Sequence, residues 1–122
     1  MIKKKIICFD IDDTICTTIN KNYFKAKPKK NAIKIINKLF KEGYRIKIFT
    51  SRFMGRNNEN VNKAKKQGYI RTQKQLKSWG LNYHQLIFGK PSYDLFVDDK
   101  CLGHKKNWHI NLKKIKSILM QK

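Results

Sequence analysis

A sequence of 122 residues is long enough for one domain with one core, residues 1–122, and too short for a catalytic domain plus a separate substrate domain. The formal net charge of +21 comes mostly from Lys spread along the chain, which favours a solvated basic surface and leaves nucleic acid open but less favoured as a partner. No apolar run approaches the roughly 18 residues of a membrane span, and acids follow the basic N-terminal head too soon for a secretory signal, so we expect a cytoplasmic protein with no membrane partner.

The first predicted strand is a continuous apolar run, Ile6 to Phe9, that ends in Asp10. Such a run is typical of a strand buried on both faces of a parallel sheet, and we expect it at the centre of that sheet. Residues 14–27 mix Thr, Asn and Lys without a sustained period. This composition predicts a loop or short hairpin.

A helix followed by a second strand is predicted next. Apolar residues recur at helical spacing after Pro28, which suits a first helical turn, and Gly43 suits the residue after a helix end. Apolar and basic residues then alternate over 44–51, which indicates a strand that ends at Thr50 and Ser51. The three elements make a βαβ unit with a right-handed crossover.

The second half of the chain continues the alternation. A polar stretch over 52–60 precedes a helix that starts near Val61, is interrupted at Gly68 and closes at Gly80. Short strands are predicted over 86–88 and 95–97, and the tail predicts a helix with one apolar face. The sequence thus predicts an α/β, Rossmann-like three-layer fold with a central parallel sheet.

Most of the 8 acidic residues lie in two groups directly after apolar runs. Asp10, Asp12 and Asp13 form the first group, and Asp98 and Asp99 form the second. Because the carboxyl ends of parallel strands lie along one crevice, we expect the two groups to meet. Crowded carboxylates repel unless a cation lies between them, and oxygen ligands suit Mg²⁺, especially beside phosphate. A magnesium-dependent, phosphate-handling enzyme is the first hypothesis.

The four expected strand ends read, in chain order, DIDDT, FTSR, GKP and VDD. This set resembles the four-motif signature of the haloacid dehalogenase superfamily of aspartyl-phosphate hydrolases, over residues 6–99. The superfamily more often has Gly where this chain has Asp13. The runs KIFTSRFMGRNNENVNK and LKSWGLNYHQLIFGKPSYDLFVDDK are also similar to small phosphatases encoded with bacterial capsule and surface polysaccharide genes.

The resemblance implies a role for each acid of the motifs. Asp10 would be the nucleophile that forms a transient aspartyl phosphate, and Asp12 would protonate the leaving alcohol and then activate water. Mg²⁺ would be held by Asp10, the main-chain carbonyl of Asp12, and Asp98. Asp99 would orient a metal-bound water or pair with Lys90.

The remaining motif residues are expected to bind phosphate or support the loop. The resemblance implies that the Thr50 hydroxyl, the main-chain N–H of Ser51 and the Lys90 ammonium contact the phosphoryl group. Arg52 is either a bidentate grip on phosphate or a substrate carboxylate, or a surface Arg. Thr14 is expected to fix the first motif's loop.

The spacing between motifs leaves no room for a cap domain, because the intervals are filled by the crossovers that the sheet needs. Specificity would then come from the loops at 14–27 and 52–60, from a neighbouring subunit of a homo-oligomer, or from substrate size. The leading function is hydrolysis of a small phosphorylated metabolite, a sugar or polar precursor of a surface polysaccharide.

Other functions stay open at this stage. The basic charge would also suit a polynucleotide end phosphatase acting on DNA or RNA termini, although Lys, Ile and Asn share A- and T-rich codons, so genome composition can account for much of the charge. A non-catalytic binding module on the same fold, and phosphotransfer to an acceptor other than water, are the further alternatives.

Overall fold

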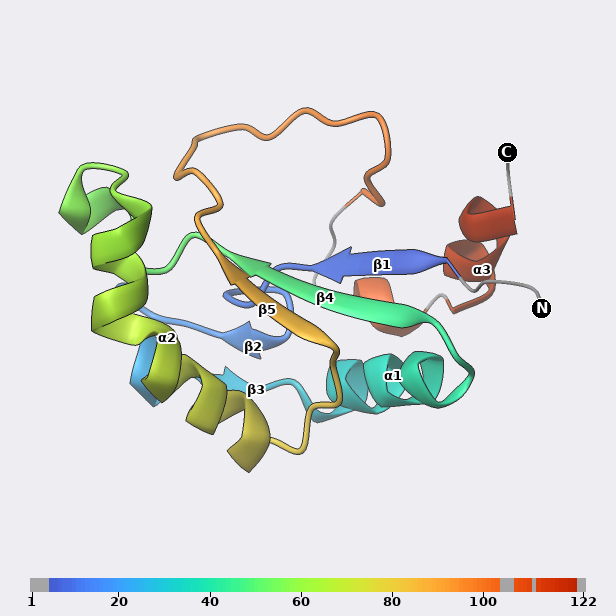
Figure 1. The fold of residues 1–122 in the computed structure, drawn as a ribbon. Coiled ribbons are helices and arrows are strands. Elements are labelled where there is room, and N and C mark those ends of the chain that lie inside the picture. The colour runs from blue at the N-terminus through green and yellow to red at the C-terminus, as the bar shows by residue number, and fades with distance from the viewer. Residues whose placement is uncertain (1–4, 104–106, 111, 121–122) are drawn as a thin grey trace.

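The fold is built on one parallel sheet. The structure, a computed structural model, describes residues 5–103, 107–110 and 112–120. The strands β1 (Ile6–Phe9), β4 (Arg45–Thr50) and β5 (Gln85–Phe88) pair in parallel in the order β1-β4-β5 (Figure 1). The prediction that the first strand is central is wrong, because β4 occupies the centre and β1 lies at one edge.

The segment predicted as a fourth strand, residues 95–97, does not join the sheet beside β1. Residues 95–97 lie in the loop that arches away from the sheet after β5 (Figure 1), and Leu95 and Val97 are 80% and 84% exposed. The rings of Tyr93 and Phe96 pack together with centroids 5.1 Å apart. Residues three apart point to opposite faces of a strand. The chain bends at Asp94 between the two rings, and residues 95–97 belong to no strand, so the prediction of a strand here is wrong.

A short hairpin and a helix join β1 to β4. Strands β2 (Cys16–Thr17) and β3 (Lys27–Pro28) pair antiparallel on either side of the 3-10 helix η1 (Tyr23–Lys25), which confirms the predicted hairpin. Helix α1 (Lys30–Lys41) buries its apolar stripe and ends before Gly43, whose φ is 98°. The helix starts later than predicted, because Pro28 pairs within the hairpin.

Helix α2 (Val61–Ser78) joins β4 to β5 without a break. The side chain of Asn60 caps it by accepting a backbone hydrogen bond at 3.1 Å. The predicted interruption at Gly68 is wrong: a Cβ there would lie 2.2 Å from Cε2 of Phe53, so glycine lets that ring pack against the helix backbone. Gly80, with φ 74°, follows the helix end as predicted.

The remaining elements are short. They are η2 (Gly55–Asn57) before α2, and η3 (Trp108–Ile110) and α3 (Leu112–Met120) in the tail. The ring of Trp108 packs against Phe9 with centroids 5.3 Å apart, and so ties the tail to the end of β1. Among the helices of the described residues, none is long and apolar enough to cross a membrane.

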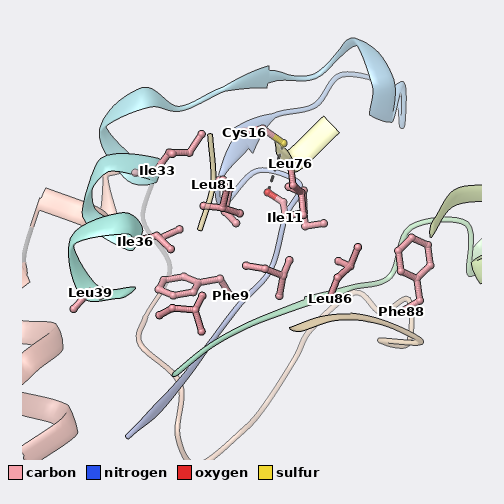
Figure 2. Close-up of a cluster of buried hydrophobic side chains, with 14 of the residues drawn as sticks. Phe9, Ile11, Cys16, Ile33, Ile36, Leu39, Leu76, Leu81, Leu86 and Phe88 are labelled. Atoms are coloured by element: carbon pink, nitrogen blue, oxygen red, sulfur yellow. Dashed lines mark hydrogen bonds between the residues drawn. The ribbon is translucent and has the colours of Figure 1, made fainter. Parts of the chain in front are cut away.

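One face of the sheet carries the core. Alternate residues of β4 and β5 are buried on this face. Figure 2 shows Leu86 and Phe88 of β5 in one cluster with side chains of α1 and the hairpin region. The opposite face is partly open, with Cys8 exposed and Lys47 half-buried. The predicted burial of the first strand on both faces is therefore wrong, and the predicted third layer is incomplete in the described part of the chain. The architecture is a small α/β fold with a parallel sheet, consistent with the Rossmann-like class.

Candidate active site

Polar side chains gather where the parallel strands end. Asp10 follows β1, Thr50 ends β4, and Lys90 comes just after β5. The N–H of Lys90 donates to the carbonyl of Thr50 at 3.1 Å, which joins two of these ends. A cavity of about 690 Å³ runs along β1 between the loop after β5 and α3. Most of its wall is apolar, and its polar end lies at the carboxyl ends of the strands, where open α/β sheets bind ligands.

The predicted site residues divide into two groups around this cavity. The cavity wall includes Asp10, Asp12, Asp13, Thr14, Lys90 and Asp98. The other predicted residues lie outside the wall: Thr50 and Arg52 are buried, Ser51 is half-buried and Asp99 is exposed. The first acidic group and one acid of the second therefore line the same cavity, but within the described residues they do not come together as one cluster.

Asp10 is a partly buried carboxylate beside a cation. Its Oδ1 lies 3.8 Å from Nζ of Lys90, and its side chain is 30% exposed. Burial raises the pKa of Asp10 above its ordinary value, and the positive charge of Lys90 offsets part of that rise. The carboxylate is thus incompletely hydrated and faces the cavity with a cation next to it.

Lys90 is held in place by the carboxylate and by two aromatic rings. Its Nζ lies 5.2 Å from the ring centroids of both Tyr93 and Phe96. Burial lowers the pKa of Lys90, but the Asp10 carboxylate and the Tyr93 hydroxyl raise it more, so the net shift is upward. A charged ammonium is therefore available near Asp10.

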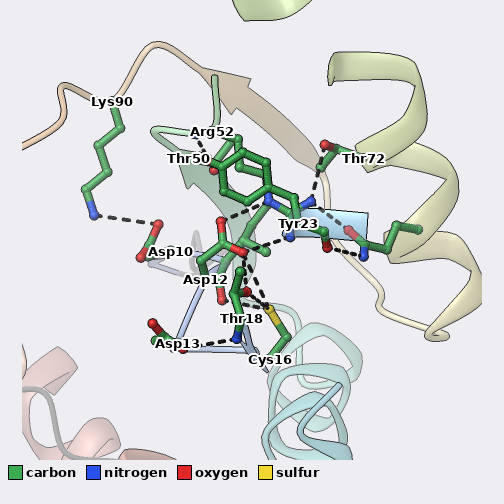
Figure 3. A network of polar contacts seen from close by, with 12 residues as sticks. Asp10, Asp12, Asp13, Cys16, Thr18, Tyr23, Thr50, Arg52, Thr72 and Lys90 are labelled. Atoms are coloured by element: carbon green, nitrogen blue, oxygen red, sulfur yellow. Dashed lines mark hydrogen bonds and ion pairs between the residues drawn. The ribbon is translucent and has the colours of Figure 1, made fainter. Parts of the chain in front are cut away.

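Asp12 is clamped by an arginine. Nε of Arg52 donates to Oδ2 of Asp12 and Nη2 donates to Oδ1, both at 2.9 Å (Figure 3). The hydroxyl of Thr18 donates to the same Oδ1 at 2.6 Å. Each of these donors suits an ionised carboxylate, which only accepts. The clamp fixes both oxygens of Asp12 on one side of the cavity.

Arg52 is enclosed rather than exposed to substrate. The residue is 1% exposed, and its remaining nitrogen, Nη1, donates to Oε1 of Gln75 at 2.6 Å and to the hydroxyl of Thr72 at 3.4 Å. The Tyr23 ring centroid lies 5.0 Å from its Cζ. In this arrangement the two guanidinium nitrogens that were expected to bind phosphate bind Asp12 instead.

Two threonines of the motifs have backbone partners. The Thr50 hydroxyl oxygen accepts the N–H of Arg52 at 3.1 Å. The carbonyl of Thr14 accepts a hydrogen bond from Nε1 of Trp108 at 2.9 Å. Thr14 is thereby part of the contact between the first motif's loop and the tail.

Asp98 lies on the cavity wall, beside Asp99. It belongs to the exposed loop after β5, where the N–H of Lys100 donates to its carboxylate at 3.2 Å and lowers its pKa. Within the described residues, no three His, Cys, Asp or Glu side chains stand close enough together to hold a metal ion. The donors are hard oxygens of the kind that Mg²⁺ takes, and Mg²⁺ needs only one or two carboxylates besides water and phosphate. The oxygen donors of Asp10 and Asp98 are of the kind that fits this ion, but in the part of the chain that the structure describes they are not assembled into a site, so one ion could join both only if the loop after β5 moved toward β1.

The residues Thr18, Thr72 and Gln75 were not predicted as part of the site. Thr72 is fully buried in the apolar stripe of α2, and a polar residue in such a stripe needs a hydrogen-bond partner. That was the available signal. Gln75 and Thr18 carry no comparable pattern in the sequence.

A surface of cations and aromatic rings adjoins the clamp. The guanidinium of Arg71 lies 3.9 Å from the Phe24 ring centroid, and that of Arg56 lies 4.7 Å from Phe53 and 5.5 Å from Tyr23. Both arginines are exposed. Helix α2, which carries Arg71, has no acidic residue. Tyr23 and Phe24 are half-buried and Phe53 is buried beneath them, so the exposed part consists mainly of the two arginines. We call these five residues the arginine–aromatic surface.

Comparison with known proteins gives a fold but no family. No protein-family model matches the chain, and no curated protein sequence matches it. The structure is similar to that of a structural-genomics target from Vibrio cholerae, with a TM-score of 0.83, 22% identity, and coverage of 94% of this chain and 96% of that one.

Two structures of the Pnkp1/Rnl/Hen1 complex, one described as an RNA repair complex, are more distant. They match with TM-scores of 0.52 and 0.51, each at 14% identity, and cover 79% and 97% of this chain. The matched parts are 31% and 32% of those chains, so this protein spans about a third of their length. At these identities the likenesses show a shared α/β fold and nothing about activity.

Proposed function

We propose that this protein is a phosphomonoester hydrolase in which Asp10 is the nucleophile. The observation that supports it is the placement of Asp10 at the end of β1, in a cavity and 3.8 Å from the Lys90 ammonium. A carboxylate can approach a dianionic phosphate only where cations offset the charge. Lys90 supplies one such cation.

The reaction would proceed in two displacements. An oxygen of Asp10 attacks phosphorus, and the bond from phosphorus to the alcohol oxygen breaks. Asp12 would first have to take a proton from solvent, because its hydrogen bonds from Arg52 and Thr18 suit the ionised form, and it then gives that proton to the leaving alcohol. Water then attacks phosphorus, the bond to Asp10 breaks, and Asp12 takes the proton from water. The same intermediate could pass its phosphoryl group to another acceptor, which is the phosphotransfer alternative.

The other motif residues would stabilise the transferring group. Lys90 would move from its contact with Asp10 to the phosphoryl oxygens, and the Thr50 hydroxyl and the Ser51 N–H would donate to them. Mg²⁺, held by Asp10, the Asp12 carbonyl and Asp98, would offset negative charge on the phosphate. Asp99 would support that ion or its water.

The preferred substrate is a small phosphorylated metabolite. A cavity of about 690 Å³ lies within the range of roughly 300 to 1,000 Å³ that small-molecule sites occupy. The resemblance of the motifs to capsule and surface polysaccharide phosphatases suggests a phosphorylated sugar or polar precursor. A phosphorylated end of DNA or RNA is the second candidate, and it is favoured by the arginine–aromatic surface and by the likeness to proteins of an RNA repair complex.

The test is phosphate release from a panel of sugar phosphates, small phosphoesters, nucleotides, and oligonucleotides with 3′- or 5′-phosphate, each with Mg²⁺ or EDTA. Release from one small-molecule class that needs Mg²⁺ and is lost in Asp10→Asn supports the proposal. Asp94→Asn, the same change at an exposed acid of the loop after β5, is the matched control and should keep full activity. Release from oligonucleotides alone would select the second candidate. Release from no substrate, with Mg²⁺ binding retained, would favour the non-catalytic module.

A further inference from the structure

Gln75 of α2 bridges two parts of the site that are distant in sequence. Its Oε1 accepts a hydrogen bond from Nη1 of Arg52 at 2.6 Å, and its Nε2 donates to the carbonyl of Tyr23 at 2.8 Å. The amide orientation is determined by these partners, because a flipped amide would set its NH₂ against the guanidinium and its oxygen against a carbonyl. Gln75 thus joins the hairpin region to the arginine that holds Asp12.

The hairpin also reaches Asp12 by a second route. The hydroxyl of Thr18 donates to Oδ1 of Asp12 at 2.6 Å, beside the bond from Nη2 of Arg52 (Figure 3). Residues 16–28 are therefore tied to this carboxylate directly through Thr18, and indirectly through Tyr23, Gln75 and Arg52. Both routes end on the same side chain.

Burial makes the indirect route sensitive to each partner. Arg52 is 1% exposed, so water cannot readily replace a lost acceptor of its guanidinium. The other acceptor of Nη1, the Thr72 hydroxyl, is at 3.4 Å and holds it more weakly. In such a network a change at one bond alters the geometry of the next.

We propose that Gln75 is a positioning residue that couples the seating of the hairpin, residues 16–28, to the orientation of Asp12. The inference rests on the proposed function, in which Asp12 exchanges protons with the leaving alcohol and with water. A general acid or base acts only within hydrogen-bond reach of its target. When the hairpin packs on α2, the Tyr23 carbonyl holds Gln75 in the position that binds Arg52. Arg52 in turn holds Asp12 within hydrogen-bond distance of the substrate.

The first test is steady-state kinetics of Gln75→Met on the best substrate of the panel. Met keeps the length of the side chain and removes both hydrogen bonds. We expect kcat to fall roughly 10- to 100-fold, the usual cost of losing a group that orients an active-site residue, with KM unchanged. Gln73→Met, the same change at an exposed position of the same helix, should leave kcat at the wild-type value. A loss confined to KM, or an equal loss in Gln73→Met, would refute the proposal.

A double-mutant cycle separates positioning from simple destabilisation. Thr18→Val removes the hydroxyl that donates to Asp12, and Gln75→Met removes an acceptor of the arginine that holds it. Because either loss alone is expected to displace the carboxylate, their combined effect on kcat should be smaller than the product of the single effects. Effects that multiply would show that Gln75 does not act through Asp12. The pair Thr18→Val and Gln73→Met should give the effect of Thr18→Val alone.

Hydrogen exchange tests the coupling without catalysis. In Gln75→Met the amides of residues 16–28 should exchange faster than in wild type and in Gln73→Met, because the hairpin has lost its bond to α2. Unchanged exchange would overturn the coupling. If exchange rises as expected but the wild type releases phosphate from no substrate, the coupling stands and the proposed function fails.

Discussion

At the scale of the residue, the Arg52 clamp should contribute strongly to stability. The Arg52 side chain is fully buried and Asp12 is 22% exposed, so removing one partner leaves a poorly hydrated charge. We expect Arg52→Met to lower the free energy of unfolding by about 3–5 kcal/mol, measured by urea denaturation at neutral pH. Arg45→Met, at the exposed start of β4, should change it by less than about 0.5 kcal/mol. An Arg52→Met protein as stable as Arg45→Met would show that the pair merely offsets its own desolvation.

The ionised carboxylate of Asp10, unlike the Arg52–Asp12 pair, should lower the stability of the folded protein. Burial raises its pKa in the folded protein, so the folded state binds this proton more tightly than the unfolded state does. Its ionisation therefore costs stability as pH rises through the raised pKa, and that cost is absent below the ordinary Asp range. We expect Asp10→Asn to be more stable than wild type at neutral pH in EDTA, with the gap closing as pH falls below about 4.

Urea denaturation of both proteins across this pH range measures the gap. Asp94→Asn, at an exposed acid, should show no comparable gap at any pH. If the stability advantage of Asp10→Asn over wild type instead grew as the pH fell, the contact with Lys90 would outweigh burial in setting the pKa of Asp10. That result would also weaken the view of Asp10 as a poorly hydrated nucleophile.

At the scale of the element, Gly68 allows the loop after β4 to pack on α2. Gly68→Ala would gain about 1 kcal/mol of helix propensity, but the new Cβ would meet Cε2 and Cδ2 of Phe53 at 2.2 and 2.4 Å. We expect a net loss of roughly 1–3 kcal/mol in the free energy of unfolding, as for other overpacked sites. In the Phe53→Ala background the same change should become neutral or stabilising. An equal loss in both backgrounds would mean that the ring is not the obstacle.

The elements also show what the sequence could predict and what it could not. The helix over 30–41 and the strands at 45–50 and 85–88 have strong local periodicity, and they form close to where the sequence placed them. The edge position of β1 depends on which strand pairs with it, which is a long-range choice that no local pattern encodes. The predicted interruption at Gly68 was wrong for a related reason. The low helix propensity of glycine can be read from the local sequence, but the Phe53 ring that packs against it cannot.

The site residues also divide into those that local sequence patterns predict and those that depend on long-range contacts. Asp10 and Lys90 follow the strand-end rule, and the structure places them on one cavity with Asp12 and Asp98, although Asp98 lies in a loop and not after a strand. The role of Arg52 could not be predicted, since it depends on α2 bringing Gln75 to one side of the guanidinium while β1 brings Asp12 to the other. Buried ionic networks of this kind are defined by the fold as a whole.

At the scale of the whole molecule, the net charge of +21 attracts any polyanion, so affinity for oligonucleotides alone does not identify a binding surface. Position does. If the arginine–aromatic surface binds a phosphorylated strand, Arg56→Gln and Arg71→Gln should each weaken binding and reduce the slope of log K against log salt by about 0.7.

The matched controls remove the same charge elsewhere. Lys34→Gln and Lys38→Gln lie on the exposed side of α1, and they should leave that slope nearly unchanged if binding is localised. Equal effects from all four variants would mean that the whole basic surface attracts the strand without a dedicated site. The substrate would then be the small metabolite that fits the cavity, because hydrolysis at Asp10 needs a phosphate placed there and a diffuse field cannot place one.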